Sequence, residues 1–148
     1  RATLGSRIRL DIDLAQGLPP ARVDPGQFEN ALLNLVVNAR DALEAGGSVR
    51  IELGCRDLAE DLFSGEDLLP AGRYLELVVI DDGSGMEAGV LDRAFDPFFT
   101  TKEPGRGTGL GLSMVFGFAR QSGGLARIGS RPGAGTRVSL LLPAHLTD

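Results

Sequence analysis

An apolar strand that ends in carboxylates and glycines is the feature that most constrains this chain. Residues 75–80 read Leu-Glu-Leu-Val-Val-Ile, and residues 81–86 continue as Asp-Asp-Gly-Ser-Gly-Met. A strand rich in Val and Ile is stiff and packs well, so it holds a carboxylate at its end in place. The glycines at 83 and 85 then let the backbone approach a ligand that a Cβ would block. Taken alone, a strand followed by an Asp-Gly turn is more often an ordinary structural turn.

Three polar side chains share one face of a predicted helix. Residues 28–43 carry apolar residues at helical spacing, and Asn34, Asn38 and Asp41 stand four and three residues apart. A helix that only needs a core would place Leu or Ala there, because Asn and Asp are mediocre helix formers and are costly to bury without partners. The three residues are therefore candidates for a site. A set of hydrogen-bonded polar groups at a solvent edge is the alternative.

A glycine-rich segment leads directly into a second predicted helix. Residues 105–112 read Gly-Arg-Gly-Thr-Gly-Leu-Gly-Leu and precede the apolar-periodic residues 113–119. A helix N-terminus favours anions, and glycines let phosphate oxygens come close to its amides. A mobile linker is the alternative. A dinucleotide fingerprint is excluded because residues 100–105 look like a loop, and a Walker loop is excluded because Gly-Lys-Ser and Gly-Lys-Thr do not occur.

Periodicity and turn residues predict a single domain over residues 1–148. We expect strands at 7–14, briefly around 23, and at 49–53, 73–80, 125–130 and 136–142, with helices at 25–45 and 110–122. Gly46 and Gly47 stop the first helix. Residues 56–72 lack a clean period and form an excursion in which a short helix near 58–63 is plausible. Helices on one face of a mixed sheet make an α/β fold, a two-layer α/β sandwich.

Composition excludes several classes of protein. The 148 residues are 43% hydrophobic and 24% charged, which is ordinary for a globular domain. A formal charge of −5 without a Lys/Arg cluster argues against nucleic acid as a partner. The lone Cys55 excludes an internal disulfide and a cysteine metal site, and we expect a buried or edge thiol of a reducing compartment. Without a membrane-length apolar run or a signal peptide, we expect a cytoplasmic domain that makes no membrane contact, and a membrane-anchored parent stays open.

Together these segments resemble the catalytic and ATP-binding domain of sensor histidine kinases, in the superfamily shared with DNA gyrase, MutL and heat-shock chaperone ATPases. The resemblance covers roughly residues 7–143. The family's boxes occur in the expected order: the asparagine box at 34–42, the first glycine box at 81–86, the phenylalanine box at 95–102, the second glycine box at 107–112 and the last at 133–136. Each box alone is weak evidence, but five in order and spacing form a strong signal.

The resemblance implies a Bergerat-type fold that binds ATP and Mg²⁺. Asp81 would accept a hydrogen bond from the adenine amino group, and Gly83, Gly85 and Met86 would form the walls of the pocket around the base. Thr136 would line the far side of the pocket, with a plain role at the start of a strand as the alternative.

The asparagine box would hold the metal and the phosphates. Asn38 would bind Mg²⁺ through its carbonyl oxygen, supported by Asn34, since this hard ion prefers oxygen ligands. Asp41, also assigned to the nucleotide site, departs from the basic residue of many histidine kinases and is similar to the subset whose box ends Asn-Ala-Arg-Asp-Ala. The role of Arg40 stays open.

Residues 96–109 would form an ATP lid. Phe95, Phe98 and Phe99 would pack this lid against the domain, while Lys102 and Arg106 are candidates to meet the phosphates or are merely solvated. The second glycine box would supply further nucleotide contacts, from Gly107, Thr108, Gly109, Leu110, Gly111 and Leu112.

The residue at position 34 favours a kinase over a hydrolase. Hydrolytic members of the superfamily carry a Glu four residues before the metal-binding Asn, whereas Asn34 has no useful basicity. We therefore assign Asn34 and Lys102 to phosphoryl transfer. Glu29 could accept a proton but is better interpreted as a surface carboxylate. A gyrase-like or MutL-like ATPase and a non-catalytic nucleotide-binding module are the alternatives.

The expected phosphoacceptor is not found in the sequence. Histidine kinases phosphorylate a histidine on a helical dimerisation domain, whereas this chain starts with an apparent strand. The single histidine, His145, lies in a tail without a helical pattern. The expected partners are therefore ATP, the histidine-containing dimerisation domain of the parent kinase and, through the parent, a response regulator.

Overall fold

The computed structural model of the chain describes residues 2–3, 8–21, 23–43, 46–64, 67–85 and 111–144. The strands are β1 (Ala2–Thr3), β2 (Ile8–Leu14), β3 (Gly47–Leu58), β4 (Leu62–Ser64), β5 (Asp67–Leu69), β6 (Gly72–Asp81), β7 (Leu125–Ser130) and β8 (Thr136–Pro143), and the helices are α1 (Pro25–Asp41) and α3 (Gly111–Gln121). No helix within these ranges is long and apolar enough to cross a membrane.

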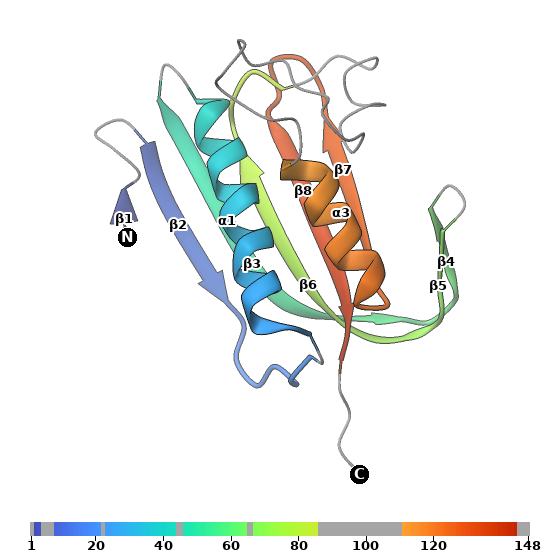
Figure 1. Cartoon of the computed structure of the whole chain (residues 1–148). Helices are drawn as coiled ribbons and strands as arrows, with labels where there is room; N and C mark the ends of the chain where they lie inside the picture. The colour runs from blue at the N-terminus through green and yellow to red at the C-terminus, as the bar shows by residue number, and fades with distance from the viewer. Residues whose placement is uncertain are drawn as a thin grey trace.

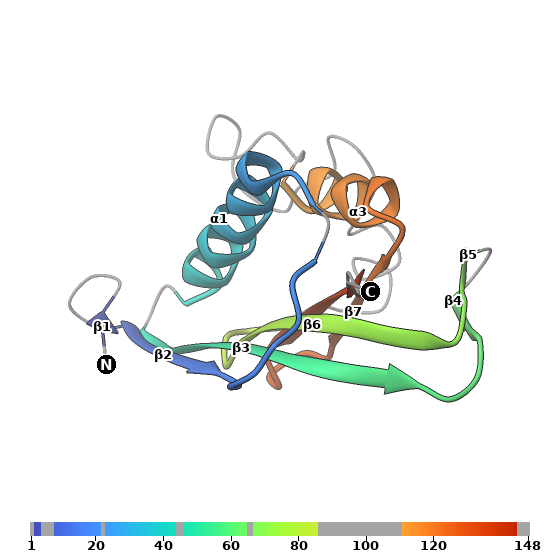
Figure 2. The same cartoon turned by 90° about the horizontal axis from the view of Figure 1, so that it is seen from below.

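The described strands form one large mixed sheet and a small hairpin. The sheet has six strands in the order β1-β2-β3-β6-β8-β7, in which β2 and β3 are parallel and the other neighbours antiparallel. Both described helices lie side by side on one face of this sheet (Figures 1 and 2). The two-layer α/β sandwich expected from the sequence is therefore confirmed.

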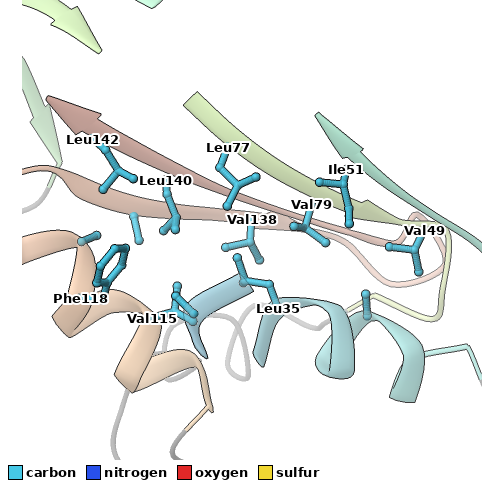
Figure 3. Packing of buried hydrophobic residues seen from close by; sticks show 14 of the residues in the cluster. Leu35, Val49, Ile51, Leu77, Val79, Val115, Phe118, Val138, Leu140 and Leu142 are labelled. Carbon is cyan, nitrogen blue, oxygen red and sulfur yellow. The ribbon is translucent and has the colours of Figure 1, made fainter. Parts of the chain in front are cut away.

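The core lies between the helices and the facing side of the sheet (Figure 3). Helix α1 contributes Ala31, Leu35 and Ala39, whose four-residue spacing places them on one stripe. Alternate residues of the central strands meet this stripe, and α3 adds the apolar side chains of its own inner face. At the contact between the helices, the rings of Phe28 and Phe118 pack edge to face with centroids 6.2 Å apart.

Helix α1 begins as expected and ends earlier than expected. Asp24 caps it by accepting a hydrogen bond from the Gln27 amide at 3.1 Å, and Pro25 occupies the first turn. The prediction carried the helix to residue 45, but it ends at Asp41. The Leu43 amide bonds the Arg40 carbonyl, and the Gly46 amide bonds the Leu43 carbonyl. Gly46 and Gly47, with φ values of 96° and 140°, then turn the chain into β3.

The segment after residue 53 is the largest correction to the predicted elements. Strand β3 continues from Gly47 to Leu58 and pairs with β6 from Val49 to Leu58. The plausible helix near 58–63 is wrong, because β3 is followed by the β4–β5 hairpin, which extends beyond the edge of the sheet in Figure 1. Leu69 of β5 is buried with Tyr74, Leu125 and Leu141 in a second apolar cluster that holds this hairpin.

Two smaller expectations also change. No strand forms at Val23; instead Ala21 makes an isolated bridge to Ala144. Cys55 is exposed, so the buried alternative for its thiol is wrong. The pairing between β2 and β3 ends at Leu53, so β3 is an edge strand where Cys55 lies.

Candidate functional site

The strand ends bring the candidate residues to one corner of the sheet. Asp81, at the end of β6, lies opposite Val49 of β3 and Thr136 of β8. Side chains alternate between the two faces of a strand, and Val79 of β6 and Val138 of β8 belong to the core under the helices. Asp81 and Thr136 are each two residues away from these valines, so they face the helices as well.

Asp81 is a buried carboxylate with two backbone donors. Its residue is 6% exposed, and the Gly83 amide donates to Oδ1 at 2.9 Å while the Thr136 amide also bonds the carboxylate. Burial raises the pKa of Asp81, the bonds from Gly83 and Thr136 partly oppose this, and the charge of Asp82 raises it further. The two donors hold the carboxylate in place, and its remaining lone pairs can accept from a ligand.

Asp82 has a separate structural role that the sequence did not indicate. Its Oδ1 accepts from the Ser48 amide at 2.8 Å, and its Oδ2 accepts from the Ser48 hydroxyl at 3.1 Å. These bonds tie the end of β6 to the start of β3, next to the buried Asp81. The sequence gives no signal of this role, because the partner of Asp82 lies 34 residues away.

The glycines of the first glycine box are required by contacts within the protein. A Cβ on Gly83 would come 2.5 Å from the carbonyl oxygen of Ala42, just after α1. Gly85 has a φ of 73°, and a Cβ there would overlap the carbonyl of Arg131 in the β7–β8 turn. These backbone contacts alone require glycine at both positions, in addition to the ligand approach that the sequence predicts. The predicted role of Gly83 and Gly85 beside a base stays a prediction.

The polar face of α1 approaches the same corner. Asn34, Asn38 and Asp41 are each half-buried, between the buried stripe of the helix and solvent. Ala42, one turn beyond Asn38, is the residue whose carbonyl meets Gly83. The structure therefore brings the end of the asparagine box and the first glycine box together. Arg40 and Asp41 form an ion pair at 3.6 Å, which is exposed and so contributes little stability.

The last glycine box lies across β6 from β3. Thr136 is the first residue of β8, which agrees with the alternative of a strand-start role, and its hydroxyl lies 2.9 Å from the hydroxyl of Ser130. The sequence interpretation gave Ser130 no role, since only the strand register places it beside Thr136.

The remaining predicted positions are partly described. The second glycine box is described only at its end, where Gly111 begins α3 and Leu112 is partly buried against the core. The other predicted site and lid residues, as well as the tail histidine, lie outside the described residues: Met86, Phe95, Phe98, Phe99, Lys102, Arg106, Gly107, Thr108, Gly109, Leu110 and His145.

Comparison with known proteins agrees with this arrangement. The model of the histidine kinase-, DNA gyrase B- and HSP90-like ATPases, HATPase_c, matches residues 23–146. The chain belongs to this family. Among curated relatives, the sensor kinase CckA of Brucella abortus (strain 2308) is 44% identical over 145 residues, which are 98% of this chain and 15% of that protein.

Two solved structures share the fold. The mycobacterial sensor histidine kinase MprB superposes with a TM-score of 0.70 at 25% identity, covering 95% of this chain and 84% of that one. Full-length ShkA in complex with AMPPNP superposes with a TM-score of 0.71 at 24% identity, covering 95% of this chain and 26% of that one. The recognition as a histidine-kinase type of ATPase domain is therefore confirmed.

Proposed function

We propose that this HATPase_c domain binds Mg·ATP and presents the γ-phosphate to a histidine on a separate dimerisation domain of a sensor histidine kinase. The observation that carries this proposal is the buried Asp81, oriented by two backbone donors at the corner where α1, β6 and β8 meet. An acceptor-only group in that setting suits an exocyclic amino group of a base. The AMPPNP bound by ShkA supports the same ligand class.

The side-chain oxygens that α1 offers fit the magnesium ion that the family implies. Asn34, Asn38 and Asp41 offer amide and carboxylate oxygens from one half-buried face, and Mg²⁺ prefers oxygen ligands while keeping several waters and phosphate oxygens. In the proposed complex Asn38 holds the ion and Asn34 supports it. The bound ion would neutralise charge on the phosphates.

Two features of α1 favour transfer over hydrolysis. Asn34 stands where hydrolytic relatives have a basic Glu, and an amide does not take a proton from water. Glu29 is exposed, and its five-residue separation from Asn34 turns it by about 140° around the helix, away from the asparagine face. With an amide at position 34 and Glu29 turned away from it, this domain acts mainly by positioning and charge neutralisation.

The partners in the proposed reaction belong to the parent protein. The chain spans 15% of the length of CckA. The proposed acceptor is the histidine of the parent's dimerisation domain, from which the phosphoryl group would pass to a response regulator. A gyrase-like ATPase and a non-catalytic module remain as the outcomes that tests would reveal.

Calorimetry of Mg·ATP binding tests the site. Wild-type chain should bind ATP more tightly with Mg²⁺ than with excess EDTA, and Asn38→Ala should remove most of that difference. Asn30→Ala is the matched control, because it makes the same substitution at an exposed position of the same helix. Equal binding by wild type and Asn38→Ala with Mg²⁺ would contradict the assignment of Asn38.

A further inference from the structure

Ser130, Thr136 and Asp81 form a row across three strands on the helix-facing side of the sheet. Thr136 of β8 pairs in register with Asp81 of β6 on one side and with Ser130 of β7 on the other. The Thr136 amide bonds the Asp81 carboxylate, and the Thr136 hydroxyl meets Ser130. Thr136 therefore links Ser130 to the proposed base acceptor.

The hydrogen bonds of Ser130 set the direction of the Thr136 hydroxyl. Ser130 Oγ lies 2.8 Å from the carbonyl oxygen of Gly135 and 2.9 Å from Thr136 Oγ1. A carbonyl only accepts, so the single hydroxyl hydrogen of Ser130 is donated to Gly135. The hydrogen between the two hydroxyls then comes from Thr136. Thr136 Oγ1 consequently presents lone pairs, rather than a hydrogen, to any further partner.

The acceptor of the Ser130 hydrogen is itself held in place. Gly135 has a φ of 79°, and a Cβ at this position would overlap the carbonyl of Asp81. The backbone of Gly135 is thus packed against the end of β6. This contact fixes the carbonyl that orients Ser130 and, through Ser130, the hydroxyl of Thr136.

We propose that Ser130 is a positioning residue for base specificity, which holds Thr136 as a hydrogen-bond acceptor beside Asp81. The proposal rests on the proposed function, since it assumes that the base binds at Asp81. The two hydrogens of an exocyclic amino group can be donated to these two neighbouring acceptors, Asp81 and Thr136. A carbonyl oxygen in place of the amino group has no hydrogen to donate to either acceptor, so a base that carries it is disfavoured at this position. Ser130 thereby supports selection of adenine over hypoxanthine without touching the base.

The test compares Mg·ATP with Mg·ITP, which carries that carbonyl oxygen. In Ser130→Ala the Thr136 hydroxyl is released and can rotate to donate to the carbonyl. The ratio of ATP affinity to ITP affinity, measured by calorimetry, should therefore fall about three- to tenfold, the range of one neutral hydrogen bond. A role confined to the β7–β8 turn would weaken both nucleotides alike and leave the ratio unchanged, which would overturn the proposal.

Two further variants keep the test specific. Ser130→Thr retains the hydroxyl on a residue that suits a strand, so it should retain most of the wild-type ratio. In a Thr136→Val background, adding Ser130→Ala should leave the ratio unchanged, because the hydroxyl that Ser130 orients is gone. A further fall of the ratio in that background would contradict the proposal, and it would do so even if Ser130→Ala alone folded poorly.

Failure of the proposed function is recognised separately with Asp81→Asn. Wild-type chain that does not bind Mg·ATP, or Asp81→Asn that binds it as wild type does, would overturn both the base site and the role of Ser130. Binding that is lost in Asp81→Asn, together with an unchanged ratio in Ser130→Ala, would overturn the role of Ser130 alone.

Discussion

Replacing Asp81 by Asn should separate nucleotide binding from folding. The amide keeps the size of the side chain and an oxygen that can accept from the Gly83 amide, now 2.9 Å from Oδ1. It removes the charge and places an NH₂ group where a second acceptor stood. The lost charge-assisted hydrogen bond amounts to about 1.5–3 kcal/mol, so ATP affinity should fall about ten- to a hundredfold.

The same substitution should change how stability depends on pH. Burial raises the pKa of Asp81 above its ordinary value of 3.8, so the folded chain binds this proton more tightly than the unfolded chain. Wild-type stability therefore falls as pH rises from about 3.8 through the raised pKa, by about 1.4 kcal/mol for each unit between the two values. The Asp81→Asn side chain does not titrate, so the free energy of unfolding of this variant relative to wild type should increase over the same pH range.

Calorimetry and urea unfolding at several pH values measure both effects. Asp82→Asn is the matched control, because it makes the same change of charge at the neighbouring exposed carboxylate, whose oxygens bond Ser48 instead. The control should bind ATP like wild type. Full ATP affinity in Asp81→Asn, or a relative stability that falls with rising pH, would refute the reasoning about the buried carboxylate.

Three further variants test the core, the glycine contact and the chemistry. Leu35→Ala should lose about 2–5 kcal/mol of unfolding free energy in urea, whereas exposed Leu33→Ala should lose little; similar losses would contradict the described core. Gly85→Ala should destabilise by more than about 1 kcal/mol, because the new Cβ overlaps a carbonyl at positive φ, and Gly54→Ala, with open space around it, should not. Asn34→Glu should raise phosphate release from ATP modestly, and no increase would contradict the position assigned to this residue.

The fold was predictable where one strong period governs a long segment. Helix α1 and the inner strands carry apolar residues at regular spacing, so the expected Asn34, Asn38 and Asp81 lie on the faces that periodicity indicates. The extension of β3 beyond residue 53 was not predictable, because its exposed edge carries charged residues and breaks the alternation of buried and exposed side chains. Local patterns there do not distinguish an exposed strand from an irregular excursion.

The fine structure of the site depends on contacts between distant segments. Gly83 was recognised as a residue that needs no Cβ, but its contact with the Ala42 carbonyl was not predicted. The role of Ser130 was not predicted, because it depends on the strand register that places Ser130 beside Thr136. Such roles follow from strand pairing and backbone packing, which no single sequence motif encodes.

The most direct measurement follows labelled γ-phosphate from Mg·ATP. The chain alone should neither become labelled nor release phosphate at an appreciable rate. Adding the parent's dimerisation domain should produce acid-labile label on the histidine of that domain, and Asn38→Ala should abolish it. Brisk phosphate release by the chain alone that depends on Asn38 would instead identify an ATPase, and label on His145 would contradict transfer to a separate domain.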